Sequence, residues 1–83
     1  MFEAEVKISL KKTVADPQGL TIKSALESLD FKGLQELRMG KLILIKLEAK
    51  DKAQAQAEVE EMCRKLLANP IIEEYSYEVK ETR

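Results

Sequence analysis

The chain has 83 residues, of which 45% are hydrophobic, so it supports one domain with one modest core. Its 14 Lys and Arg residues nearly balance its 15 Asp and Glu residues, for a formal charge of −1. This balance argues against a surface for nucleic acid or an anionic membrane. The sequence has no His, and Cys63 is its one Cys, which excludes an internal disulfide, a His-based catalytic arrangement and the commonest metal ligand.

The patterning gives no sign of a membrane or secreted protein. No stretch approaches the roughly 18 consecutive apolar residues that a membrane span needs. The start, MFEAEVKIS, has no basic region followed by an apolar run, which is the pattern of a secretory signal. We therefore expect a cytoplasmic protein that forms one domain over residues 1–83, and its small core favours oligomerisation.

The first predicted element is a strand over residues 2–10. Apolar residues alternate there with polar ones, with the period of two that is typical of a strand with one buried face. Lys11 and Lys12 then lead into a polar loop.

The stretch VADPQGLTI, residues 14–22, marks the change from strand to helix. Asp16 is a candidate cap and Pro17 suits the first helical position, because its missing N–H has no partner there anyway. Ile22 and Leu29 belong to an apolar stripe with helical spacing. Gly19 fits less well, because glycine in a first turn costs up to about 1 kcal/mol relative to alanine. Either the helix begins later, near Thr21, or backbone packs closely against Gly19, within the subunit or from a partner.

Residues 34–49 are predicted to be extended. Apolar residues dominate the odd positions, and the even positions are mixed. We favour one long strand that is bent or bulged at Gly40. A hairpin turn at residues 39–41 is the alternative.

The second predicted helix begins at Asp51, which together with Gln54 resembles a capping box. Its apolar stripe contains Ala55, Val59, Met62, Cys63, Leu66 and Leu67. Asn69 can take the left-handed cap conformation, and Pro70 prevents continuation. A last strand is predicted from residue 71 or 72 to about Val79, with Tyr75, Tyr77 and Val79 on one face.

These elements predict an α+β two-layer sandwich with the order β-α-β-α-β, a ferredoxin-like variant with a long bent middle strand. Both helices are expected on one face of a mostly antiparallel sheet. A hairpin in the middle stretch would instead give the ferredoxin-like order β-α-β-β-α-β.

The candidate chemical groups have structural interpretations that we favour. Cys63 lies at a core position, and the adjacent acidic residues of Glu60-Glu61 and Glu73-Glu74 point in different directions, which predicts a solvated surface. Tyr75 and Tyr77 are expected to cover a core edge or an interface. Lysines and Arg38 on the middle strand lack the aromatic platforms that RNA-binding sheets use.

Leu42 and Leu44 are the residues that a monomer does not explain. They occupy the outer face of the middle strand, where a half-buried strand should be polar. Burying each is worth about 1.5 to 3 kcal/mol. We therefore predict that they form an interaction surface.

As a whole, the chain resembles the PurS family, the small subunits of phosphoribosylformylglycinamidine (FGAM) synthase. The likeness covers nearly the full length and rests on four segments in matching order. They are KISLKKTVADPQG, ALESLDFKGLQELRMGK, the strand that follows, and EMCRKLLANPIIEEYSYEV. The most specific parts are the Asp-Pro-Gln-Gly corner, Arg38-x-Gly40-Lys41 and residues 63–73. Asp30 departs from the family pattern, because a glycine commonly closes the first helix there.

The resemblance implies a non-catalytic subunit of a purine-biosynthesis complex. A glutaminase subunit would release ammonia, and a large synthetase subunit, which would hold ATP and Mg, would use it to convert formylglycinamide ribonucleotide. The small subunit would form a dimer or tetramer, help the other two associate and support ammonia transfer. No catalytic, cofactor-binding or metal-binding residue is then expected on this chain.

The resemblance also implies interface roles at particular positions. By resemblance these are Arg38, Gly40, Lys41, Asn69 and Pro70. Leu42 and Leu44 join the suspected partner or oligomer interface on physical grounds, and Gly19 joins it through the close packing expected there. The alternative function is an ACT-like regulatory module that binds a small molecule, for which an amino acid should shift the melting temperature. A nucleic-acid binder would instead show salt-sensitive retention on RNA.

Overall fold

The computed structural model describes residues 1–82. The elements are β1 (Phe2–Leu10), α1 (Pro17–Ser28), β2 (Gly40–Leu47), α2 (Lys52–Met62), the π-helical turn η1 (Cys63–Leu67) and β3 (Glu73–Glu81). This confirms the predicted order β-α-β-α-β. The hairpin alternative is wrong, because β2 is a single strand. No helix in the described range is long and apolar enough to cross a membrane.

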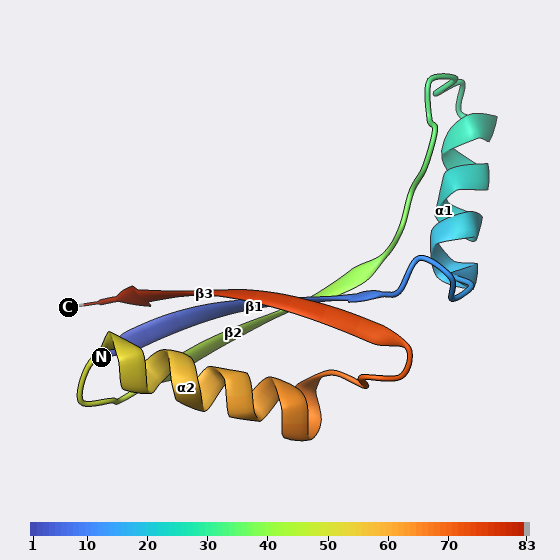
Figure 1. Ribbon diagram of the computed structural model, residues 1–83. Helices are drawn as coiled ribbons and strands as arrows, with labels where there is room; N and C mark the ends of the chain where they lie inside the picture. Colours follow the sequence, from blue (N-terminus) through green and yellow to red (C-terminus); the bar gives the residue numbers. More distant parts are fainter. Residues whose placement is uncertain (83) are drawn as a thin grey trace.

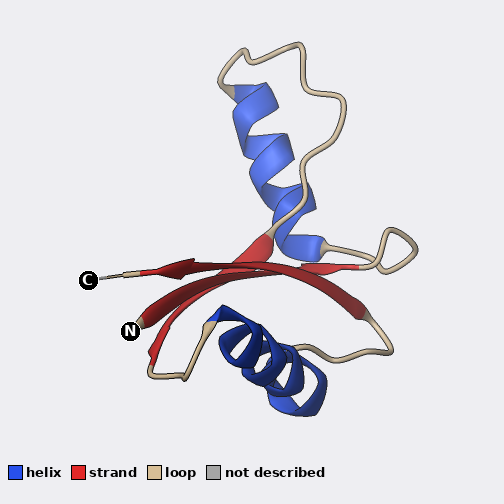
Figure 2. Ribbon diagram, turned by 60° about the vertical axis from the view of Figure 1, so that its left-hand side comes forward, coloured by secondary structure: helices blue, strands red, loops and turns tan. Residues whose placement is uncertain are grey.

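The three strands form one antiparallel sheet in the order β2-β1-β3. Alternation in β1 has the predicted effect, because Phe2, Ala4, Val6 and Ile8 are buried on one face. The other face carries alternate residues of all three strands, and we call it the open face. Both figures show α2 covering only the opposite face of the sheet (Figures 1 and 2).

Helix α2 supplies the other half of the core. Ala55, Val59 and Cys63 are buried against the sheet, together with Val79 of β3. The predicted capping box is present in a slightly shifted form. Asp51 accepts a hydrogen bond from the Gln54 N–H at 2.8 Å, and the Gln54 side chain accepts one from Lys50 N–H at 2.6 Å. The backbone N–H groups of Lys50 and Gln54 therefore each have a side-chain acceptor where α2 begins.

The end of this helical segment differs from the prediction. In η1 the Ala68 N–H donates to the Cys63 carbonyl at 3.1 Å, an i to i+5 bond that shifts the helical phase. Leu66, predicted on the buried stripe, is consequently 84% exposed. Asn69 does not take the left-handed cap conformation that is open to it, because in the described range the non-glycine residue with positive φ is Asp30, at 75°. The Asn69 side chain instead accepts a hydrogen bond from Ile71 N–H at 3.0 Å, which forms a turn.

Helix α1 stands away from the sheet on the side opposite α2 (Figures 1 and 2). Together with the returning segment, residues 29–39, it forms a protrusion that we call the arm. The prediction that both helices cover one face is therefore wrong. The apolar residues of α1 have the helical spacing that was predicted, but the sheet does not cover them. Leu29 is 68% exposed, and within α1 only Gly19 is buried.

The returning segment is also not the predicted strand. Residues 34–39 run back alongside α1 without strand pairing, and β2 begins only at Gly40. The result is an extended subunit with a radius of gyration of 16.3 Å. A compact chain of this length would have about 12 Å. The arm is thus outside the core that the single subunit builds.

Candidate functional site

The suspected interface residues gather around one end of the sheet. The register places Gly40 beside Ser9 and Glu73 beside Leu10, so the end of β1 and the starts of β2 and β3 meet there. The arm leaves the sheet at the same end (Figure 1). Leu42 and Leu44 continue from it along β2 on the open face.

The open face combines exposed leucines with charged neighbours. Leu42 is 59% exposed and Leu44 is 63% exposed, and their partners on β1 are Lys7 and Glu5. A shallow pocket of about 680 Å³ lies where this face meets the base of the arm. Its lining includes Lys7, Ser9, Arg38, Met39, Leu42 and Ser76. The surplus of apolar surface predicted for β2 is therefore present, and the single subunit leaves it uncovered.

The Arg38 side chain turns back onto its own chain. Its guanidinium donates hydrogen bonds from Nη2 to the carbonyls of Lys11 at 3.0 Å and Val14 at 2.9 Å. These bonds tie the segment just before β2 to the loop after β1. The interface role that the resemblance implies for Arg38 stays a prediction, but this part of its side chain is already engaged.

Lys41 and Asn69 meet at Glu73. Lys41 Nζ lies 3.3 Å from a Glu73 carboxylate oxygen, and the other oxygen accepts from Asn69 N–H at 2.8 Å. The Asn69 N–H and then the Lys41 ammonium lower the pKa of Glu73. Glu73 is thus a half-buried link between the α2–β3 connection and β2, which corrects its assignment to a solvated pair, while Pro70 stays exposed.

Both suspected glycines are sites of close backbone approach. A Cβ on Gly40 would lie 2.7 Å from the Ile8 carbonyl oxygen. A Cβ on Gly19 would lie 2.2 Å from Asp16 Oδ2 and 3.0 Å from the Leu37 carbonyl oxygen. The close packing expected at Gly19 is confirmed and lies within the subunit. The helix also begins at Pro17 rather than near Thr21, with Asp16 as its cap.

Asp16 does more than cap the helix. Its Oδ1 accepts from Gly19 N–H at 3.1 Å, as predicted, and its Oδ2 accepts from Met39 N–H at 2.8 Å. The Met39 and Gly19 N–H groups and the nearby Arg38 charge lower the pKa of Asp16. Sequence reasoning missed the second bond, because the local pattern accounts for a cap but not for a contact 23 residues away.

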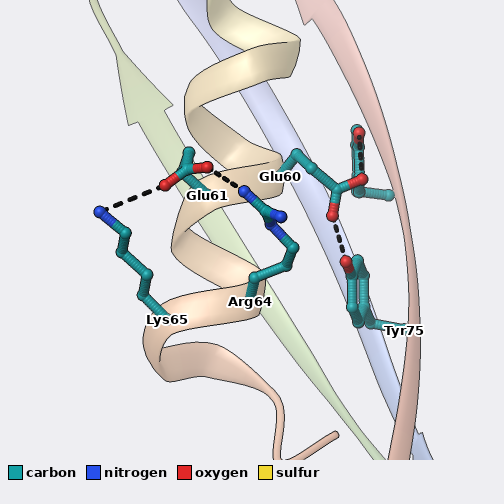
Figure 3. A network of polar contacts seen from close by, with 6 residues as sticks. Glu60, Glu61, Arg64, Lys65 and Tyr75 are labelled. Carbon is teal, nitrogen blue, oxygen red and sulfur yellow. Dashed lines mark hydrogen bonds and ion pairs between the residues drawn. The ribbon is translucent and has the colours of Figure 1, made fainter.

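A second polar cluster joins α2 to β3 (Figure 3). Glu60 accepts hydrogen bonds from the hydroxyl groups of Tyr75 and Tyr77, whose rings stack with centroids 6.5 Å apart. The bond to Glu60, with desolvation, raises the pKa of Tyr75 to about 12. Desolvation and the Glu60 charge raise the pKa of Tyr77. The tyrosines cover a core edge, one of the two roles expected for them, and Glu60 is not simply solvated.

The remaining charged and nucleophilic groups near this cluster have structural roles. Glu61 pairs with Lys65 at 3.2 Å and with Arg64 along the same helix, and these bonds lower the pKa of Glu61 (Figure 3). Cys63 is fully buried, and burial followed by the Glu60 charge raises the pKa of its thiol. This confirms the prediction of an apolar core thiol, since a reactive cysteine needs a lowered pKa and access.

The elements define a small α+β subunit of ferredoxin-like order, with a three-stranded antiparallel sheet that its own helices cover on one face only. Residues 1–82 contain no group of three or more His, Cys, Asp or Glu side chains arranged to hold a metal ion, and the polar groups described above bind one another. Exposed large apolar side chains lie on the open face and on the arm, and also at Leu66 and Ile71. The comparisons with known proteins agree with this class.

The PurS model, described as phosphoribosylformylglycinamidine (FGAM) synthase, matches residues 3–81. Subunit PurS of this synthase from Bacillus subtilis is 43% identical over 98% of this chain and 95% of the relative. The subunit from Methanocaldococcus jannaschii is 45% identical over 96% of each chain. The chain belongs to the PurS family of FGAM synthase subunits.

Solved structures support the same relationship. Crystalline M. jannaschii PurS, one of the subunits of formylglycinamide ribonucleotide amidotransferase in the purine biosynthetic pathway, superposes with a TM-score of 0.90, at 43% identity and with 100% of each chain covered. A chain in the structure of PurLQS from Thermotoga maritima gives a TM-score of 0.88, at 33% identity, over 95% of this chain and 96% of that chain.

Proposed function

We propose that this chain is the non-catalytic small subunit of an FGAM synthase complex in the cytoplasm. It brings a glutaminase subunit and a large synthetase subunit together and supports ammonia transfer from glutamine to formylglycinamide ribonucleotide. The observation that carries the proposal is the full-length match to the PurS family, which includes a chain of the PurLQS structure. ATP and Mg belong on the synthetase subunit in this proposal, and the small subunit contributes surfaces.

The chemistry of the described residues supports a role without catalysis. A nucleophile or a general acid needs a free group with a pKa suited to its task. Cys63 is buried with a raised pKa, and Tyr75 is held by Glu60 with a pKa of about 12. These shifts move the thiol and the phenol away from neutral pH, which fits a structural use of both.

We also propose that a second copy of the chain covers the open face and the arm. Leu42 and Leu44 on the open face and Leu20, Leu29 and Phe31 on the arm are each more than half exposed. Exposed apolar residues that lie together on one side of a subunit, rather than scattered singly, are typical of an interaction site. The arm rises on the open-face side of the sheet, so both parts of the surface are on the side away from α2 (Figure 2).

The extended shape supports self-association independently. The subunit measures 50 × 30 × 14 Å, and α1 lies outside its core. A helix this short is marginal in water without tertiary packing. A neighbouring copy that packs on the arm would supply the packing that its own sheet does not. Measurement of the oligomer mass would distinguish a dimer from a tetramer.

Complex formation tests the proposal directly. The chain would be mixed with purified glutaminase and synthetase subunits of an FGAM synthase in the presence of ATP, Mg and glutamine, and run on size exclusion with light scattering. We expect one peak that contains all three subunits, whose mass requires this chain. Identical masses with and without the chain would overturn the assembly role. Sedimentation of the chain alone over a range of concentrations tests self-association, which a constant monomer mass would contradict.

A further inference from the structure

The arm joins the sheet through a small polar junction made of Asp16, Gly19, Arg38 and Met39. Asp16 is the buried charged residue of the described chain, with 5% exposure. Its two carboxylate oxygens divide their bonds between the first turn of α1 and the end of the returning segment. One side chain therefore fixes the chain entering the arm to the chain leaving it.

Arg38 makes the same connection in the opposite direction. It belongs to the leaving segment, and its guanidinium binds the Lys11 and Val14 carbonyls of the entering segment. Each segment thus contributes one charged side chain that binds the backbone of the other. Charge-assisted hydrogen bonds of this kind are roughly twice as strong as neutral ones.

Gly19 allows the two segments to approach. The Leu37 carbonyl of the returning segment lies where a Cβ on Gly19 would be only 3.0 Å away. Any larger residue would push the helix from the returning segment or displace the Asp16 carboxylate. The glycine that helix propensity disfavours is explained by this contact.

The junction is the main attachment that α1 has to the rest of the subunit. Only Gly19 of α1 is buried, and the figures show the helix standing clear of the sheet and of α2 (Figures 1 and 2). Farther out, Lys23 Nζ donates to the Gln35 carbonyl at 3.3 Å, but this bond lies within the arm. The orientation of the arm relative to the open face therefore depends on Asp16 and Arg38.

We propose that Asp16 and Arg38 are positioning residues that hold the arm at the angle at which the arm and the open face form one surface for a second copy. The inference rests on the proposed self-association. Holding the arm before the encounter lowers the ordering cost of association, so loss of the junction weakens binding even though neither side chain need touch the partner.

The experiment measures arm orientation and association separately. Spin-labelled cysteines replace Lys32 near the arm tip and the exposed Lys52 at the start of α2, on the layer away from the open face, while buried Cys63 remains unlabelled. An excess of unlabelled subunit suppresses distances between copies. Pulsed EPR then gives the distance distribution from the arm to α2. We expect a narrow distribution for the parent chain. Asp16→Asn and Gly19→Ala should each broaden it and raise the Kd of self-association about tenfold to a hundredfold.

Two control variants show whether the effects come from the junction or from the type of substitution alone. Gly33→Ala makes the same substitution on the arm, where a Cβ would meet nothing within 4 Å. Asp51→Asn changes the cap of α2, which makes no second contact like the one to Met39. Both controls should keep the narrow distribution and the parent Kd. Should Asp16→Asn fail to fold, Gly19→Ala with its own control still decides the question.

Each result has one meaning. An unchanged narrow distribution in both junction variants overturns the positioning role. A broadened distribution with an unchanged Kd overturns its link to association. A monomeric parent chain contradicts the proposed self-association instead, and the EPR comparison then still shows whether the junction orients the arm.

Discussion

The exposed leucines of β2 give the strongest quantitative prediction about self-association. Full burial of a Leu side chain is worth about 1.5 to 3 kcal/mol. Leu42 and Leu44 are 59% and 63% exposed, so each retains roughly 1 to 2 kcal/mol that burial by a partner would realise. A symmetric dimer covers the pair twice, which amounts to about 4 to 7 kcal/mol. This corresponds to about three to five orders of magnitude in Kd.

The perturbation is the double substitution Leu42→Glu and Leu44→Glu. It removes this apolar surface and adds charge beside Glu5, the β1 partner of Leu44. Size exclusion with light scattering over a range of concentrations should show the monomer mass where the parent chain is a dimer or tetramer. Far-UV circular dichroism and a melting curve verify that the sheet remains folded.

Leu66→Glu is the matched control, because Leu66 is 84% exposed but lies at the other layer of the subunit, on η1. It should leave the oligomer mass unchanged. An unchanged mass for the folded double variant at every concentration would refute the assignment of the open face to self-association.

Three further predictions concern the polar clusters and the core. Because the chain has no Trp, absorbance at 295 nm should show Tyr75 titrating with a pKa of about 12, and Glu60→Gln should shift that midpoint toward 10. The raised pKa favours the neutral phenol in the folded state, so its stabilisation is lost as pH rises from about 10 through about 12. The lowered pKa of Asp16 stabilises the arm above about pH 4, and arm order in the EPR measurement should be lost as pH falls through that pKa. Val59→Ala, at a fully buried site, should lower the free energy of unfolding by about 2 to 3 kcal/mol in urea titrations.

Each of these has a clear contrary result. If Glu60→Gln leaves the tyrosine titration unchanged, Glu60 does not hold the phenols. If Asp16→Asn and the parent chain lose arm order over the same pH range, another group controls the arm. A loss below about 0.5 kcal/mol for Val59→Ala would mean that α2 does not close the core.

The sequence was sufficient for those features that are decided locally. Strand β1 follows from strict alternation, and the caps at Asp16 and Asp51 follow from side chains that bond three residues ahead. The left-handed conformation of Asp30 was not predicted, although Asp tolerates positive φ better than most residues and the family commonly has glycine there.

The features that could not be predicted depend on contacts between distant segments. The stripe of α1 has the correct period, but periodicity does not specify whether the stripe is covered by the same sheet, by a partner or not at all. Residues 34–39 alternate like a strand and find no neighbour to pair with. The phase shift at η1 exposes Leu66, and no residue pattern marks it.

The suspected interface residues divide in the same way. Leu42 and Leu44 were selected on physical grounds and are exposed as expected. Arg38, Lys41 and Asn69 were selected by resemblance, and the structure gives each of them a bond within the subunit. A contact with another subunit stays a prediction for all of them. The dual role of Asp16 needed the fold, because Met39 is 23 residues away in sequence and approaches Asp16 only in the folded subunit.

Glutamine-dependent synthesis tests the central claim most directly. Formation of formylglycinamidine ribonucleotide would be measured for the glutaminase and synthetase subunits, with and without this chain, using glutamine or ammonium chloride as the nitrogen source. We predict that omitting the chain reduces the glutamine-dependent rate to background and leaves the ammonium-dependent rate in place. Equal glutamine-dependent rates with and without the chain would contradict the account.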